Sequence, residues 1–144
     1  MKTETFLKQL RHDDIVAAIR EAELMTSGEI RVFISTKEIS QPIEVAKEHF
    51  VRMKMTKTRE RNGVLIFVAP VTQKFAVIGD VEVHKRCGEP FWTELAAGMS
   101  GHFREAKFSQ GIIHGVKTAG KLLAKHFPRR PDDKNELPDE VIKD

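Results

Sequence analysis

The stretch GVLIFVAPVTQKFAVIGD (residues 63–80) decides the fold of this chain. It opens with a continuous apolar run of strand length, residues 63–69, which is typical of a strand covered on both faces. Residues 70–73 predict a turn and residues 74–80 a second strand, so the stretch folds back on itself as a hairpin. The stretch therefore predicts a sheet with helices on its faces.

The sequence before the hairpin predicts a helix, a strand and another helix. Asp13 or Asp14 can cap the first helix, and Gly28 is well placed just past its end. Residues 29–35 are rich in β-branched residues and predict a strand, and Pro42 suits the first turn of the second helix. Because a helix connects them through a right-handed crossover, this strand and the first hairpin strand are expected to be parallel.

Two further helices are expected after the hairpin, near residues 89–103 and 107–127. The second hairpin strand is antiparallel to the first, so the sheet is mixed. The predicted fold class is α/β: a three-layer α/β/α sandwich with a small mixed β-sheet and the element order α-β-α-β-β-α-α.

Composition and charge narrow the class of protein. The chain has 144 residues with a net charge of +3, which fits one domain with a real core. A single cysteine, Cys87, excludes an intrachain disulfide and a cysteine-rich metal site. The longest apolar run, residues 64–69, is far shorter than the ~20 residues of a membrane helix, and no signal-peptide core is present. We expect a soluble, cytoplasmic monomer.

The end of the chain differs in charge from the rest. Residues 128–144 contain six acids, four bases and three prolines, a net charge of −2 that leaves +5 on residues 1–127. Repeated prolines and few apolar residues are typical of a flexible segment. The sequence therefore predicts a folded domain over residues 1–128 and a flexible Pro/acid-rich tail over residues 129–144.

Polar residues are expected to converge at one edge of the sheet. The starts of the two parallel strands and the end of the antiparallel strand meet there, which brings together Glu29, Asn62 and Asp80. Glu23 arrives at the end of the first helix, where the macrodipole disfavours a carboxylate. Carboxylate and amide oxygens are ligands that Ca²⁺ prefers. The hypothesis is a divalent-cation site made by Glu23, Glu29, Asn62 and Asp80.

A purely structural interpretation competes with this cation site. Glu29 can pair with Arg31, Arg61 or a lysine, and Asp80 can cap a short helix that follows it. A second candidate region is the basic segment 52–61, with five bases and one acid, which could contact nucleic acid or another anionic surface. The segment has no aromatic residue to stack on bases, which disfavours nucleic acid.

Four segments together resemble the TPM domain family, the phosphatase-like domain of thylakoid-lumen type. In order they are AIREAELMTSGEIRVFI (18–34), TRERNGVLIFVAP (58–70), KFAVIGDVEVH (74–84) and PFWTELAAGM (90–99). The resemblance implies a compact α/β/α domain and a binder of divalent cations, Ca²⁺ especially, or an acid phosphatase. Family members are often exported and membrane-anchored. This chain is expected to be a soluble, cytoplasmic-type member, since it lacks the signal and the anchor. It also differs from the family pattern at Glu82, where a glycine is common.

Our leading hypothesis from the sequence is a non-enzymatic accessory module that binds calcium, with magnesium as the alternative, and acts through an unidentified protein partner. The first alternative is a metal-dependent acid phosphatase of the same fold, which rests on the resemblance. The chain has no Cys-x5-Arg loop, no Asp-x-Asp nucleophile motif and no P-loop. The second alternative is binding of nucleic acid or an anionic surface through residues 52–61.

Overall fold

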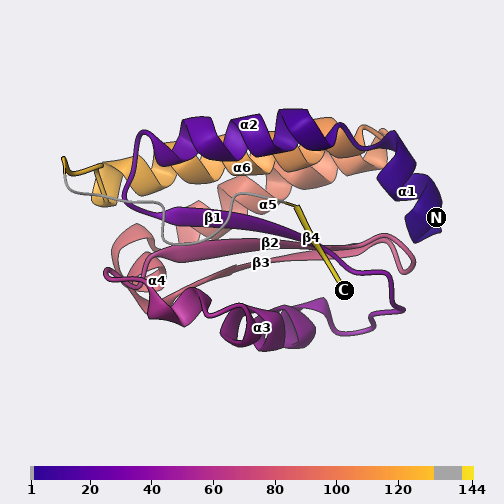
Figure 1. The fold of residues 1–144 in the computed structure, drawn as a ribbon, viewed down its shortest axis with the longest axis horizontal. Coiled ribbons are helices and arrows are strands. Elements are labelled where there is room, and N and C mark those ends of the chain that lie inside the picture. The colour runs from indigo at the N-terminus through magenta and orange to yellow at the C-terminus, as the bar shows by residue number, and fades with distance from the viewer. Residues whose placement is uncertain (1, 132–140) are drawn as a thin grey trace.

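The computed structural model describes residues 2–131 and 141–144. Its centre is a sheet with the strand order β3-β2-β1-β4 (Figure 1). The strands are β1 (Glu29–Ile34), β2 (Gly63–Ala69), β3 (Lys74–Gly79) and β4 (Val141–Lys143). β1 is parallel to β2, and β3 is antiparallel to β2, as the sequence predicted.

Helices cover both faces of this sheet. In Figure 1 helices lie both above and below the sheet. The upper layer consists of α2 (His12–Glu23), α5 (Glu89–Arg104) and α6 (Phe108–His126), and the lower helix is α3 (Pro42–Arg52). Shorter helices are α1 (Thr3–Gln9), α4 (Val81–Cys87) and the 3-10 turn η1 (Met55–Lys57). The three-layer α/β/α sandwich is confirmed.

The two middle strands explain why residues 63–69 are apolar without alternation. Successive side chains of β2 point to opposite faces: Val64 packs in the core below α2, α5 and α6, whereas Leu65 packs in the core against α3. Every residue of β1 and β2 is buried. The prediction that the hairpin's first strand is covered on both faces is confirmed.

Two details of the first predicted helix are wrong. The helix α2 begins at His12 with Arg11 at its N-cap, so Asp13 and Asp14 lie in its first turn and do not cap it. There their charges still favour the positive end of the helix dipole. The helix ends at Glu23, five residues before Gly28. Gly28 is needed for packing, because an added Cβ would lie 2.9 Å from Leu123 Cδ1 of α6.

The predicted flexible tail requires a correction at its last residues. Val141–Lys143 form a short strand parallel to β1, with Val141 opposite Val32. The outer edge of β1 offers backbone groups that need partners, and a strand satisfies them. The Asp144 carboxylate anchors the strand, because Oδ2 accepts from Ser35 Oγ at 2.6 Å and Oδ1 from the Thr36 backbone N–H at 2.6 Å. The rest of the predicted tail, over residues 132–140, lies outside the described residues.

Candidate functional site

The predicted acidic corner forms at one end of the sheet. Glu29 at the start of β1 pairs in register with Gly63 at the start of β2, and Val64 pairs with Gly79 at the end of β3. The starts of β1 and β2 and the end of β3 therefore meet, as the topology predicted. The structure adds two arginines to this corner, and these decide its chemistry.

Arg31 binds the two glutamates. Its Nη1 donates to Glu23 Oε2 at 2.8 Å, and its Nη2 lies 3.4 Å from Glu29 Oε1. The three side chains are buried, with exposed fractions of 1% for Arg31, 7% for Glu23 and 3% for Glu29. Glu23 Oε2 also accepts the Ile30 backbone N–H at 3.0 Å. The interpretation that Glu29 pairs with Arg31 is confirmed, and Glu23 joins the same ion-paired cluster.

Arg61 binds the third carboxylate. Its Nε and Nη2 donate to the two oxygens of Asp80 at 2.7 and 2.8 Å, a bidentate pair. These hydrogen bonds, and then the charge of Asp80, raise the pKa of Arg61 above its ordinary value. Asp80 Oδ1 also accepts from the Val81 backbone N–H at 2.8 Å and so caps α4. The predicted capping role of Asp80 is confirmed.

Asn62, the remaining predicted ligand, donates from Nδ2 to Ser27 Oγ at 3.0 Å. Within residues 2–131 and 141–144, no three His, Cys, Asp or Glu side chains are grouped so that they could hold a metal ion. The predicted residues thus lie at one edge, with Glu23 and Glu29 sharing Arg31 and Asp80 held separately by Arg61. Cation binding stays a prediction.

A groove that the sequence analysis missed runs along β3. It has a volume of about 630 Å³ and is bordered by α3 on one side and α5 on the other. Seven consecutive residues, 75–81, line it. Three large apolar side chains on its walls face solvent: Ile43 is 54% exposed, Val51 63% and Val81 55%. Ile43 and Val51, eight positions apart on α3, were the available signal, since that spacing puts them on one side of the helix.

The basic segment 52–61 lies at one end of this groove. Val51 and Thr56 line the groove. Exposed cations lie close to them in the sequence: Arg52, Lys54 and Lys57. Lys47 adds a further cation to the α3 wall. The groove therefore has apolar walls with exposed cations at this end, and its lining also holds the carboxylate of Asp80, which Arg61 binds.

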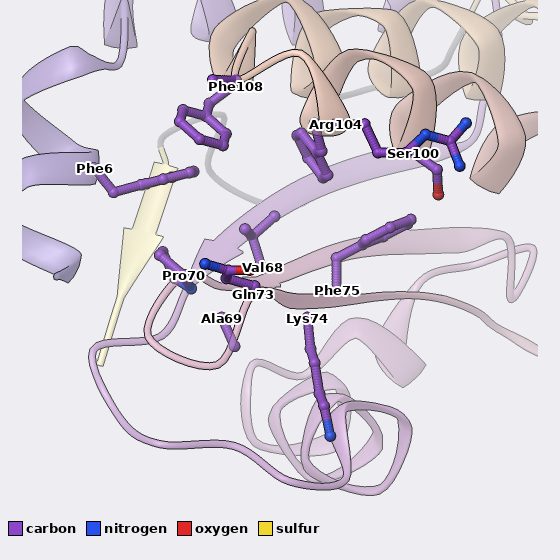
Figure 2. Close-up of a pocket in the computed structure, with 12 residues that line it drawn as sticks. Phe6, Val68, Ala69, Pro70, Gln73, Lys74, Phe75, Ser100, Arg104 and Phe108 are labelled. Carbon is purple, nitrogen blue, oxygen red and sulfur yellow. The ribbon is translucent and has the colours of Figure 1, made fainter. Parts of the chain in front are cut away.

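A second cavity lies at the other end of the sheet, beside the β2–β3 turn. It has a volume of about 500 Å³ (Figure 2). Side chains of α1, β2, β3, α5 and α6 surround it, and many are apolar. Those that line it include Phe6, Val68, Phe75, Ser100, Arg104 and Phe108.

No helix in the described part of the chain is long and apolar enough to cross a membrane.

Comparisons with known proteins show which proteins this chain resembles. A search of curated proteins finds no match. The solution structure of the N-terminal domain of a protein from P. gingivalis has a TM-score of 0.55 at 13% identity over 79% of this chain and 75% of that chain, which shows a shared fold. The NMR structure of the BA42 protein from the psychrophilic bacterium Bizionia argentinensis has a TM-score of 0.87 at 37% identity, covering 92% of each chain. The family model of the TPM domain matches residues 1–122, and the chain therefore belongs to the TPM domain family.

Proposed function

We propose that this TPM domain is a non-enzymatic binding module that holds an extended, acidic segment of a partner protein in the groove along β3. The observation that carries the proposal is the exposure of Ile43, Val51 and Val81, which all line this groove. Exposed apolar side chains scattered singly need no explanation, but a cluster in a groove is typical of an interaction site.

The edge of β3 offers a template for a further strand. The Asp80 backbone N–H donates to the Gly63 carbonyl at 3.0 Å, which sets the alternation of the antiparallel ladder. By that alternation the backbone groups of residues 76 and 78 face β2, and those of Phe75, Val77 and Gly79 face outward. Outward N–H and C=O groups on an edge strand pair readily with an extended peptide. The walls formed by α3 and α5 would then receive its side chains.

Charge favours an acidic partner. Lys47, Arg52, Lys54 and Lys57 are exposed, and none of them forms an ion pair with another described residue. A segment that alternates apolar residues with Asp or Glu would match both the groove and its rim. Nucleic acid and anionic membranes would need the same cations but would make no use of the apolar walls.

The test is a selection from a displayed library of random peptides about a dozen residues long, using the full chain as bait. Binders are expected to alternate apolar and acidic residues and to shift the amide resonances of residues 75–81. Val51→Asp should abolish this binding. The matched control is Leu24→Asp, because Leu24 is 71% exposed and lies outside the groove.

Backbone methylation of a selected peptide tests strand pairing directly. Only alternate N–H groups of an added strand face β3, so methylation in one register should abolish binding and in the other should change it by less than about threefold. Equal effects of methylation in both registers would overturn strand addition. A selection that enriches no peptide would overturn the binding module itself.

We also propose that divalent-cation binding, with calcium first and magnesium as the alternative, uses Asp80 and Asn62 rather than the two glutamates. The supporting observation is that the Arg61 side chain is 44% exposed and can leave Asp80, whereas Arg31 is 1% exposed. Arg61→Met should therefore tighten calcium binding. A calcium titration followed by amide NMR should shift residues 61–63 and 79–84 more strongly in this variant. Unchanged spectra in both proteins would refute the proposal.

A further inference from the structure

We propose that the cavity beside the β2–β3 turn binds an amphipathic carboxylate such as a medium-chain fatty acid. The cavity of about 500 Å³ has the size of a small-molecule pocket. It lies at the opposite end of the sheet from the acidic corner, because Lys74 begins β3 and Asp80 follows its end. This cavity is distinct from the groove along β3 that we propose for a protein segment, and the two share only Phe75 among their lining residues.

The walls of the cavity are aromatic. Four phenylalanines from four elements line it, and their rings form a connected row. Ring centroids are 4.9 Å apart between Phe6 and Phe108, 6.2 Å between Phe108 and Phe103, and 5.3 Å between Phe103 and Phe75. Figure 2 shows Phe6 and Phe108 on one side of the open space and Phe75 on another. Such walls favour an apolar tail over a polar ligand.

One cation is available at the rim for an anionic head group. Arg104 lines the cavity, is exposed, and forms no ion pair with any described residue. Its neighbour in sequence, Glu105, pairs instead with Lys107 at 3.1 Å. Ser100 lies one helical turn before Arg104 on α5 and also lines the cavity, so its hydroxyl can donate to the same carboxylate. Guanidinium groups bind carboxylates through two parallel hydrogen bonds.

The second cation at the cavity is directed elsewhere. Lys74 contributes its stem to the lining, but its Nζ donates to the Ser40 carbonyl at 2.9 Å. In Figure 2 its side chain runs away from Phe6 and Phe108. Lys74 is therefore a matched control for Arg104: a cation that borders the same cavity but does not face it.

The two loops at the mouth are held in an uncommon backbone conformation. Gln73 has φ of 56° and Ala106 has φ of 58°, the left-handed region that residues other than glycine rarely adopt. Both residues line the cavity. Backbone strain of this kind concentrates where a binding site must keep its shape.

The experiment is an amide NMR titration of the full chain with decanoate below its micellar concentration, with decanol as the uncharged probe. Decanoate should shift residues 68–75 and 100–108. Arg104→Gln should weaken decanoate binding about tenfold and leave decanol unchanged, as expected for loss of one charge-assisted contact. Lys74→Gln should leave both affinities unchanged.

Three results would overturn the proposal. They are the absence of decanoate shifts at these residues, equal weakening by Arg104→Gln and Lys74→Gln, and equal affinity for decanoate and decanol in the unmodified chain. Both substitutions are at exposed positions, where the fold should tolerate them, and a loss of folding would be seen as spectral changes across the whole chain. Arg104→Lys keeps the positive charge and should therefore retain the decanoate binding that Arg104→Gln loses.

Discussion

Removal of the Arg31 guanidinium should be among the most damaging single changes to this fold. Arg31 is fully buried and holds Glu23 at 2.8 Å, with Glu29 at 3.4 Å. The substitution Arg31→Met keeps an apolar stem of similar length and removes the charge. It leaves two buried carboxylates without this cation, which is the costly way to break a buried ion pair.

The expected loss is about 3–5 kcal/mol of the free energy of unfolding. Domains of this kind are stable by about 5–15 kcal/mol, so the variant should lose about a fifth of its stability or more. With a urea dependence of about 2 kcal/mol per molar, the unfolding midpoint should fall by about 1.5–2.5 M.

Urea unfolding followed by circular dichroism and by the fluorescence of Trp92, the only tryptophan, measures this loss. The control is Arg11→Met. Arg11 forms an ion pair with Asp14 at 3.5 Å, but the two side chains are 61% and 56% exposed. Surface pairs contribute about 0–1 kcal/mol, so the control should shift the midpoint little.

A further variant separates the lost ion pair from lost packing. Glu23→Gln and Glu29→Gln, added to Arg31→Met, remove the two charges that the arginine neutralised. The triple variant should recover most of the lost stability, because an apolar or neutral replacement of a whole buried cluster is often tolerated. A loss below about 1 kcal/mol for Arg31→Met, or no recovery in the triple variant, would refute the reasoning.

Three other predictions follow from single contacts. Asp144→Ala should release β4, which would be measured as lost amide protection of residues 141–143. Burial alone raises the pKa of Asp144, but the hydrogen bonds from Ser35 and Thr36 outweigh this effect and lower the pKa. The anchoring is therefore present above pH about 4 and is lost as the pH falls below that value. Ala106→Gly should stabilise the chain by about 1 kcal/mol in urea unfolding, because φ of 58° strains alanine but not glycine; no gain would contradict this account. If the family-based phosphatase hypothesis holds, metal-dependent hydrolysis of a generic phosphate ester should be abolished by Asp80→Asn, and unchanged activity would indicate a contaminant.

Much of the fold was predictable because its signals are local. The bounds of β2 were predicted without error, since an unbroken apolar run of strand length that ends at Pro70 is typical of a strand covered on both faces. The capping role of Asp80 was among the predicted alternatives. β4 was missed, because three residues beyond a proline-rich segment carry no periodic pattern, and their pairing depends on the free edge of β1.

The candidate site shows the same division. The meeting of Glu29, Asn62 and Asp80 at one edge followed from strand direction, and that of Glu23 from the end of the helix before β1. Their partners did not, since a sequence offers several arginines and lysines for each acid, and only distance and burial choose among them. The groove along β3 was also hidden, because it depends on where the tertiary structure places α3 and α5 beside β3.

The sequence by itself determined the layers of this protein, the direction of its central strands and its membership of the TPM domain family. These properties follow from hydrophobic periodicity and turn residues, which act over a few neighbouring positions. Only the tertiary structure decided that Arg31 and Arg61 neutralise the acidic corner, that β4 pairs with β1, and that the groove along β3 and the cavity beside the β2–β3 turn remain open. These are consequences of contacts between residues far apart in the chain, and their energies depend on burial, which no local pattern specifies.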